Sequence, residues 1–505
     1  MSRAETLSVI QTERVSSGID RAGVEQYAQA SRSWILFVLC AIGIIPFWSV
    51  RYPVVTDYPD HLARWFILFH MKDGAYHFSN LYSPAWGPLP YISPDILAMA
   101  LQYILPINVI GKCILSLCVI LIAYATYFFL KEARPENVGL ASFGILMAFN
   151  PDLLMGSISN QFSLAFCLLV VGLWVRYCRT PKVVTAMGIV IGVLLVYLSH
   201  LSGFFVAGLT MGVYALFQPH RWKKLGTLAL LSLPALLIFV HDPNHAGNGA
   251  SLRYGQFTGK VKDLVFPLRL FSSKTLDLIF LAGLALLVLL ILKSRPKFAW
   301  QPVWLAVCAI VLLAYFVAPG QYGFGAYIDT RFLPFVYLFL LAAVRFDRVP
   351  RYLYVGLALL VLFRVATVEE IFVSHNHELE QLTASFEAIP RNAKVLPLIP
   401  LPGNIIGRSD IHHLEYGVIE RGFLDPQVFH LQGVQPIRLV GSPYCPNVFC
   451  DVADAPDVDW EQVASYYDYL WVHDDPAIAP FTSHIGDVIF SNGSVTVYRV
   501  RQPRL

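Results

Sequence analysis

Four ionisable side chains lie within eight residues in the segment TDYPDHLAR: Asp57, Asp60, His61 and Arg64. A carboxylate can take the proton of a hydroxyl group that attacks an activated carbon, and a nearby cation can stabilise a leaving phosphate. Pro59 favours the first turn of a helix, so we expect Asp57 near the N-cap and the other three on the first turns. A structural role is the alternative, in which Asp57 caps the helix and Asp60 pairs with Arg64.

The elements that must hold this cluster are predicted to be membrane-spanning helices. Of the 505 residues, 56% are hydrophobic and 14% charged, and the mean hydropathy is +0.56, which leaves too little polar surface for a soluble globule of this size. A helix of about 20 apolar residues crosses a bilayer. We predict an α-helical polytopic membrane protein of about eleven spans, centred on 34–50, 107–130, 138–150, 160–175, 183–198, 201–217, 225–240, 275–292, 302–318, 332–344 and 352–368.

The distribution of Lys and Arg predicts which loops are cytoplasmic. These two residue types occupy 14 of 31 positions in five short loops: 131–137, 176–182, 220–224, 293–297 and 345–351. Residues 1–33 are polar and lack the apolar stretch of a signal peptide, so they are predicted to be a cytoplasmic tail. The opposite side then holds loops 51–106 and 241–274. It also holds the C-terminal part from about 372, where short strand-like pieces between turn residues predict a small α/β domain.

Two short helices are predicted in the first outer loop. One runs from the acidic cluster to about His70 and presents an apolar face to the membrane, and the other covers 95–106 and is too short to span. The acidic side chains would thus be held at the boundary between lipid and water.

Cationic side chains that could hold a phosphate lie in the later outer loops. Arg253 and Lys260 belong to the second, and Arg331 stands where the tenth span enters the membrane. His200 lies in an outward-facing turn and could touch the same ligand. For each of these residues, a solvated loop, ordinary turn chemistry or an interfacial arginine is the plain alternative.

No cofactor is predicted, and a divalent metal has little support. His241, Asp242 and His245 are candidate ligands, but no further acid lies near them. Cys445 and Cys450 flank Pro446 in a polar region. They could close a small disulfide loop if that region is extracytoplasmic, or remain two free thiols.

In layout, the whole chain resembles the GT-C superfamily of integral membrane glycosyltransferases. These proteins share the set of spans, an acidic first outer loop with helices along the membrane, and often a periplasmic C-terminal domain. TDYPDHLAR resembles the D-x-P-x-H-x-x-R form of uncharacterised bacterial members. Many GT-C families carry adjacent acids, whereas here Asp57 and Asp60 are three apart. Either could therefore be the catalytic base, and Asp57 is favoured.

The resemblance implies transfer of a sugar from a polyprenyl-phosphate donor to an extracytoplasmic acceptor, with inversion. Its implied organisation is a cytoplasmic tail (1–33), a transmembrane domain (34–371) and a periplasmic domain (372–505) in the bacterial inner membrane. Asp57 and Asp60 would be catalytic, and substrate would be bound by His61, Arg64, His200, Arg253, Lys260 and Arg331. The implied partners are the lipid-linked donor, a lipid or glycan acceptor and membrane lipids. Nucleic acid is not expected, because the net charge of +3 is scattered.

Two other functions remain open on the sequence. A transporter or flippase of lipid-linked glycans would place paired charges inside its spans, and Arg364 is the main charge found there. An O-antigen ligase or polymerase would carry its large functional loop late in the chain. No nucleotide-binding P-loop, dinucleotide fingerprint or serine-hydrolase elbow occurs in the sequence.

Overall fold

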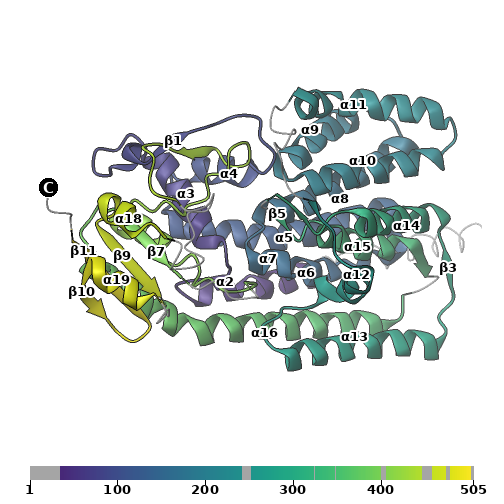
Figure 1. Ribbon diagram of the computed structural model, residues 1–505. Coiled ribbons are helices and arrows are strands. Elements are labelled where there is room, and N and C mark those ends of the chain that lie inside the picture. The colour runs from purple at the N-terminus through teal and green to yellow at the C-terminus, as the bar shows by residue number, and fades with distance from the viewer. Residues whose placement is uncertain are drawn as a thin grey trace, which may run out of the picture.

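The computed structural model describes residues 34–241, 252–323, 325–346, 349–399, 405–445, 458–473 and 478–501, and most of them form helices (Figure 1). Four helices are long and apolar enough to cross a membrane: α5 (Ile107–Ala133), α8 (Ile158–Arg179), α11 (Arg221–His241) and α13 (Lys274–Ser294). Shorter apolar helices accompany them: Trp34–Ser49, α9 (Val183–Ser199), α10 (Leu201–Leu216), α14 (Pro302–Val317), η5 (Thr330–Phe332) and α15 (Leu333–Ala343). The longest helix, α16 (Arg351–Ala384), has 34 residues.

The predicted spans coincide with these helices except at 138–150. There the chain forms separate short pieces: η2 (Pro135–Leu140), α6 (Phe143–Ala148) and α7 (Pro151–Met155). The chain is therefore not one continuous helix here: it breaks between η2 and α6, and again before Pro151, which opens α7 at a position where proline is favoured. A Cβ on Gly144 would lie 2.6 Å from the Thr126 hydroxyl of α5. The number of spans stays a prediction.

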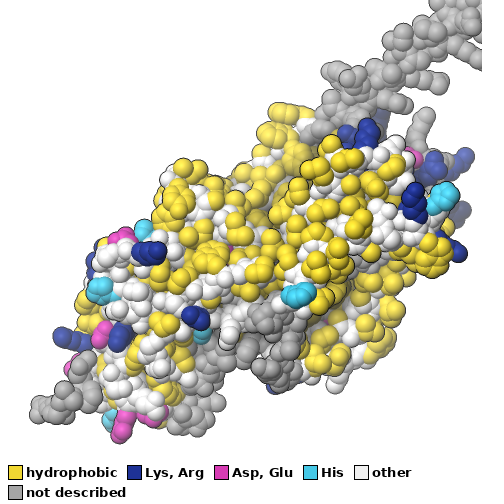
Figure 2. Space-filling view, turned by 90° about the horizontal axis from the view of Figure 1, so that it is seen from above, with side chains coloured by type: hydrophobic (Ala, Val, Ile, Leu, Met, Phe, Trp, Pro, Cys, Tyr) yellow, Lys and Arg dark blue, Asp and Glu magenta, His cyan; other side chains and the backbone are white. Residues whose placement is uncertain are grey.

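Burial separates the central helices from the peripheral ones. In the most apolar stretch of α5, 61% of the residues are buried inside the protein, and in that of α8, 78% are buried. In α11 and in α13, only 11% of the corresponding residues are buried. Figure 2 shows hydrophobic side chains over the middle of the molecule and charged ones gathered toward its two ends. This distribution is typical of a protein whose middle faces lipid.

The segment 51–106, predicted to be the first outer loop, contains the expected short helices but is more buried than expected. It contains α3 (Tyr58–His70), η1 (Phe78–Asn80), β1 (Tyr82–Pro84) and α4 (Ser93–Leu101). In α3 the buried residues run almost continuously from Tyr58 to Leu68. The expected membrane-facing stripe is therefore not what the structure shows, because the C-terminal part of the chain covers the outer side of α3.

The C-terminal part forms the predicted α/β domain. Its sheet has the order β10-β11-β9-β7 and is made of β7 (Val395–Leu398), β9 (Tyr469–His473), β10 (Gly486–Ser491) and β11 (Val495–Val500). Strand β7 pairs parallel with β9, and the other pairs are antiparallel. The remaining elements are η6 (Ser385–Ala388), α17 (Glu415–Arg421), β8 (Ile437–Leu439), α18 (Trp460–Tyr466) and α19 (Ala479–Ile485).

Two connections tie this domain to the rest of the chain. Helix α16 runs without a break from the apolar helices to the sheet (Figure 1), so the predicted boundary at 371/372 falls inside a helix. Strand β8 pairs antiparallel with β1 of the first outer loop. Cys445 is disulfide-bonded, and its predicted partner Cys450 lies outside the described residues.

The second and third outer loops are also joined. Strand β2 (Leu252–Arg253) pairs with β4 (Gln321–Tyr322), which pairs with β5 (Gly325–Ala326). In sequence, β2 is followed by α12 (Phe257–Lys262) and η4 (Asp263–Leu268). At the other ends of the helices, β3 (Phe298–Trp300) pairs with β6 (Val344–Phe346).

Candidate active site

Asp57 stands at the N-cap position of α3, but its side chain makes no capping hydrogen bond. Its backbone N–H donates to Met155 O at 3.0 Å at the end of α7. The side chain remains 22% exposed, in a cluster whose other members are mostly buried. The carboxylate is thus held in place through its backbone and is left accessible. Capping does not explain this residue.

Burial raises the pKa of Asp57 to about 6, against the opposing charges of His412 and Arg331. A carboxyl group with a pKa near neutrality is a better proton acceptor than an ordinary aspartate and is still ionised at pH 7. These are the properties of a general base.

Asp60 lies in a different environment. Its side chain is 0% exposed, accepts a hydrogen bond of 2.9 Å from the backbone N–H of Phe429, and lies 3.5 Å from the Arg64 guanidinium. Burial raises the pKa of Asp60 well above its usual value. A carboxyl group held in this way links α3 to the C-terminal domain.

His61 and Arg64 are enclosed as well. Arg64 Nε donates to Asp95 of α4 at 2.9 Å. Its Nη2 lies 2.8 Å from His61 Nδ1, and His61 Nε2 lies 2.8 Å from Gly156 O. Since arginine only donates, His61 accepts at Nδ1 and donates from Nε2 as a neutral ring. Burial and Arg64 lower the pKa of His61 to about 3. These contacts brace α3 against α4 and α7, and they bury the Arg64 side chain between two carboxylates, Asp60 and Asp95.

The C-terminal domain contributes a histidine that the sequence reasoning missed. His412 Nε2 lies 3.8 Å from the Asp57 carboxylate, and His412 Nδ1 donates to Glu415 at 2.8 Å. Burial alone would lower the pKa of His412. The negative charges of Glu415, Asp60 and Asp57 have a larger effect in the opposite direction, so the pKa is raised to about 10. His412 is therefore a cation beside the candidate base. The segment DIHHLE held the signal, but nothing local connects it with a residue 355 positions earlier.

Asp60, His412 and Glu415 are also the described residues best placed to hold a metal ion, since one donor atom from each lies within 4.8 Å of the others. Two of the three already pair with each other through the hydrogen bond between His412 and Glu415. Of the ligands considered from the sequence, His241 bonds to the backbone at Leu237, and Asp242 and His245 lie outside the described residues.

Arg331 and His200, which come from different parts of the chain, are in contact. Arg331 Nη1 lies 2.8 Å from His200 Nε2, and its Nη2 donates to Ala326 O at 3.2 Å. Asp152 of α7 is buried nearby, and burial raises the pKa of Asp152 to about 6 while Arg331 lowers it. The structure thus places the two predicted binding residues together, on the flank of the candidate base.

Lys260 and Arg253 do not join this group. The Lys260 ammonium is buried 3.1 Å from Asp329 and donates to the carbonyls of Tyr315 and Ala318. It stabilises the turn before Arg331 and has no free donor for a ligand. Arg253 lies on β2 with an exposed side chain.

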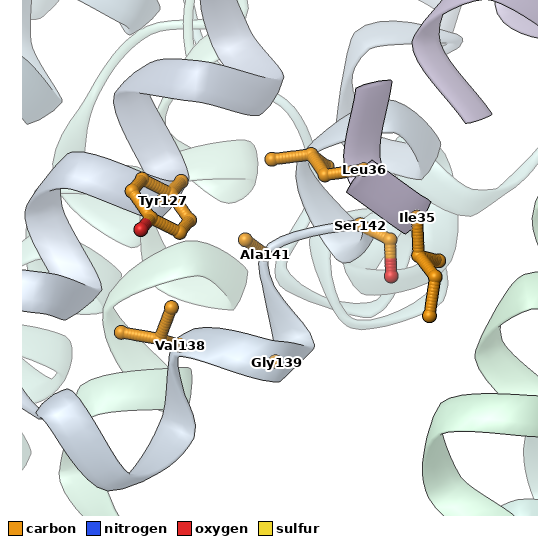
Figure 3. A pocket seen from close by; sticks show the side chains of 7 residues that line it. All are labelled: Ile35, Leu36, Tyr127, Val138, Gly139, Ala141 and Ser142. Carbon is orange, nitrogen blue, oxygen red and sulfur yellow. The ribbon is translucent and has the colours of Figure 1, made fainter. Parts of the chain in front are cut away.

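A cavity of about 20 Å³ elsewhere in the protein is not the site. Figure 3 shows it lined by Ile35, Leu36, Tyr127, Val138, Gly139, Ala141 and Ser142. It has room for about one water molecule and no carboxylate, so the chemistry belongs to the cluster around Asp57.

Neither a protein-family model nor a curated protein matches the sequence. Among solved structures, the chain is similar to ArnT from Cupriavidus metallidurans bound to undecaprenyl phosphate, with a TM-score of 0.53, 10% identity, and 92% of this chain and 97% of that chain covered. The chain has the fold of ArnT. The apo state of the same protein aligns over 93% of this chain and 98% of that one, at 10% identity and a TM-score of 0.48. At 10% identity this likeness concerns the fold alone.

Proposed function

We propose that this protein transfers a sugar from a polyprenyl-phosphate donor to an acceptor hydroxyl on the outer face of the membrane, with Asp57 as general base. The observation that carries the proposal is the setting of Asp57. It is a partly exposed carboxylate that lies 3.8 Å from the cation His412 and is influenced by the charge of Arg331, next to helices that can span a membrane.

In the proposed reaction, Asp57 takes the proton of the acceptor hydroxyl as its oxygen attacks the anomeric carbon. The bond from that carbon to the phosphate breaks, and the electron pair leaves with the polyprenyl phosphate. One displacement from the opposite face inverts the anomeric centre. Arg331 is the cation placed to stabilise the leaving phosphate, because its hydrogen bonds go to neutral acceptors only.

The class of donor is supported by the fold and by location. The ArnT structure of the same fold holds undecaprenyl phosphate, and a sugar on such a carrier presents its anomeric carbon at the membrane surface. The transporter alternative loses support, because Arg364 has a structural role. It donates to Leu268 O and lies 3.8 Å from the Phe280 ring, which fixes the loop before α13.

Transfer of radiolabelled sugar from a panel of polyprenyl-phosphate sugars by the purified protein tests the proposal. We expect Asp57→Asn to lose at least about a hundredfold in transfer rate while it still binds donor, which is the usual contribution of a general base. Asp60→Asn serves as the comparison and should lose much less transfer, because the Asp60 side chain is 0% exposed and does not reach the acceptor. If no donor on the panel is consumed, the proposal is wrong. Loss of transfer in Asp60→Asn alone would instead make Asp60 the base.

A further inference from the structure

A continuous chain of hydrogen bonds links the candidate phosphate-binding arginine to a buried carboxylate. Arg331 Nη1 contacts His200 Nε2 at 2.8 Å, and His200 Nδ1 contacts Ser202 Oγ at 2.8 Å. Ser202 Oγ donates to Asn160 Oδ1 at 2.8 Å, and the Asn160 amide donates to Asp152 at 3.2 Å. Four of the five side chains are buried: Asp152, Asn160, His200 and Ser202. We call these five residues the Arg331 chain.

The hydrogen bonds at the two ends of the Arg331 chain have a fixed direction. A guanidinium only donates, so His200 Nε2 accepts from Arg331, while Nδ1 of the same ring faces Ser202 and accepts from its backbone N–H at 3.1 Å. The serine hydroxyl then donates to Asn160, whose amide donates to the carboxylate. Burial and Arg331 keep the pKa of His200 well below its usual value, in agreement with a neutral ring. The edge of the Tyr91 ring also packs on His200 at 4.6 Å.

The far end of the Arg331 chain is the helix that holds the candidate base. Asp152 belongs to α7, and the backbone N–H of Asp57 donates to Met155 at the end of that helix. Contacts to α7 therefore help to hold both the Arg331 guanidinium and Asp57 in position. A free arginine side chain has many rotamers, and ordering them on binding costs free energy. If the side chain is already held in one conformation, ligand binding does not include that cost.

Arg331 still has a donor to offer. Its Nε is buried and makes no hydrogen bond within the described residues, and its two other contacts are with neutral acceptors. A buried cationic donor without a partner is costly, and an anion would satisfy it.

We propose that Asp152, Asn160, Ser202 and His200 are positioning residues that hold the Arg331 guanidinium for the phosphate of the lipid-linked donor, an inference that rests on the proposed function. None of the four needs to touch the donor for its loss to weaken donor binding.

The test compares two buried serines near the junction of α9 and α10. Ser202→Ala breaks the Arg331 chain in the middle. Ser199→Ala is the matched control, because Ser199 is equally buried but bonds to Leu195 O and Ser93. The probe is sugar-free polyprenyl phosphate in detergent, with affinity measured by titration calorimetry. We expect roughly a tenfold loss of affinity for Ser202→Ala, less than twofold for Ser199→Ala, and recovery in Ser202→Thr, which keeps the hydroxyl.

A double-mutant cycle shows whether the chain acts through Arg331. Arg331→Met alone should weaken binding more than Ser202→Ala, and the double variant should bind no worse than Arg331→Met. Thermal unfolding of each variant checks that it is folded. If the two losses multiply, or if Ser202→Ala behaves like Ser199→Ala, the inference is overturned.

These outcomes are distinct from a failure of the proposed function. One outcome is that the wild-type protein binds polyprenyl phosphate, with Ser202 and Arg331 coupled in the double-mutant cycle, and yet transfers no sugar from any donor. That result would support the positioning role and refute the transferase. A protein that transfers sugar but shows no coupling between Ser202 and Arg331 would refute the positioning role alone.

Discussion

At the scale of single residues, the two aspartates of the first outer loop differ in what surrounds them. Asp57 has a side chain that is 22% exposed and a pKa of about 6. Asp60 is enclosed by Arg64, a backbone amide and the His412 pair. A base must reach its substrate, so accessibility separates two residues of identical chemistry that stand three positions apart.

The raised pKa of Asp57 predicts a stability cost with a definite pH dependence. Its pKa rises from 3.8 to about 6 on folding, so ionisation is harder in the folded state than in the unfolded one. The cost is absent below about pH 4 and complete above about pH 6. The shift corresponds to about 3 kcal/mol at most, and partial exposure makes about 1–2 kcal/mol the expected value.

Asp57→Asn removes that cost. We expect this variant to unfold at a higher temperature than wild type at pH 7.5, with the difference shrinking as the pH is lowered to 4.5, while transfer activity is lost. Thermal unfolding in detergent at both pH values measures it. A variant less stable than wild type at pH 7.5 would show that the Asp57 charge supports the fold, and the assignment as a functional residue would weaken.

At the scale of elements, the short helix α7 and the turn after it contact several residues of the candidate site. Helix α7 ends at Gly156, which has a φ of 91° in the left-handed region that favours glycine. A Cβ at this position would lie 2.7 Å from the Asp57 Cβ and 2.9 Å from its backbone nitrogen. Gly156 O also accepts the His61 hydrogen bond. One turn thus sets the approach of α3 to α7.

Gly156→Ala should therefore disturb both stability and catalysis. The left-handed backbone costs an alanine about 1–2 kcal/mol, and displacement of Asp57 should lower transfer by roughly tenfold or more. The control is Gly208→Ala in α10, where a Cβ would meet nothing within 4 Å and alanine favours the helix. Unfolding temperature and transfer rate are measured together. Equal behaviour of the two variants would contradict the alignment by α7.

At the scale of the whole molecule, the candidate site is assembled from distant parts of the chain. The segment 51–106 supplies the carboxylates. Arg331 of η5 supplies a cation that contacts His200, and the C-terminal domain supplies His412, Glu415 and the Phe429 amide. The C-terminal domain is therefore a wall of the site, and its docking through β1 and β8 is expected to persist in the active protein.

A disulfide across β1 and β8 tests that docking. Ser83 and Arg438 face each other in the antiparallel pair, and residues so placed have Cα atoms about 4.5–5.5 Å apart, within the disulfide range. Ser83→Cys with Arg438→Cys should cross-link under mild oxidation and keep transfer within about twofold of the single variants. Gel mobility with and without reductant reports the bond. Absence of a cross-link would contradict the docked arrangement.

Most of the helices could be predicted from hydropathy along the chain. Apolar segments of spanning length predicted helices that the structure contains, except at 138–150, where the chain forms the separate pieces η2 and α6. The TDYPDHLAR segment pointed to Asp57, because residue type, a helix start and a position just beyond an apolar segment are all local properties.

Which charged side chains are enclosed by partners could not be predicted from the sequence. Arg64 and Lys260 looked equivalent to Arg331 along the sequence, yet each is buried against its own aspartate, Asp95 and Asp329. His412 lies in the site, although nothing local in the sequence connects its segment DIHHLE with Asp57. The physical reason is the same in each case: whether a charge is neutralised, enclosed or left facing a ligand depends on partners far away in sequence, and packing alone brings them together.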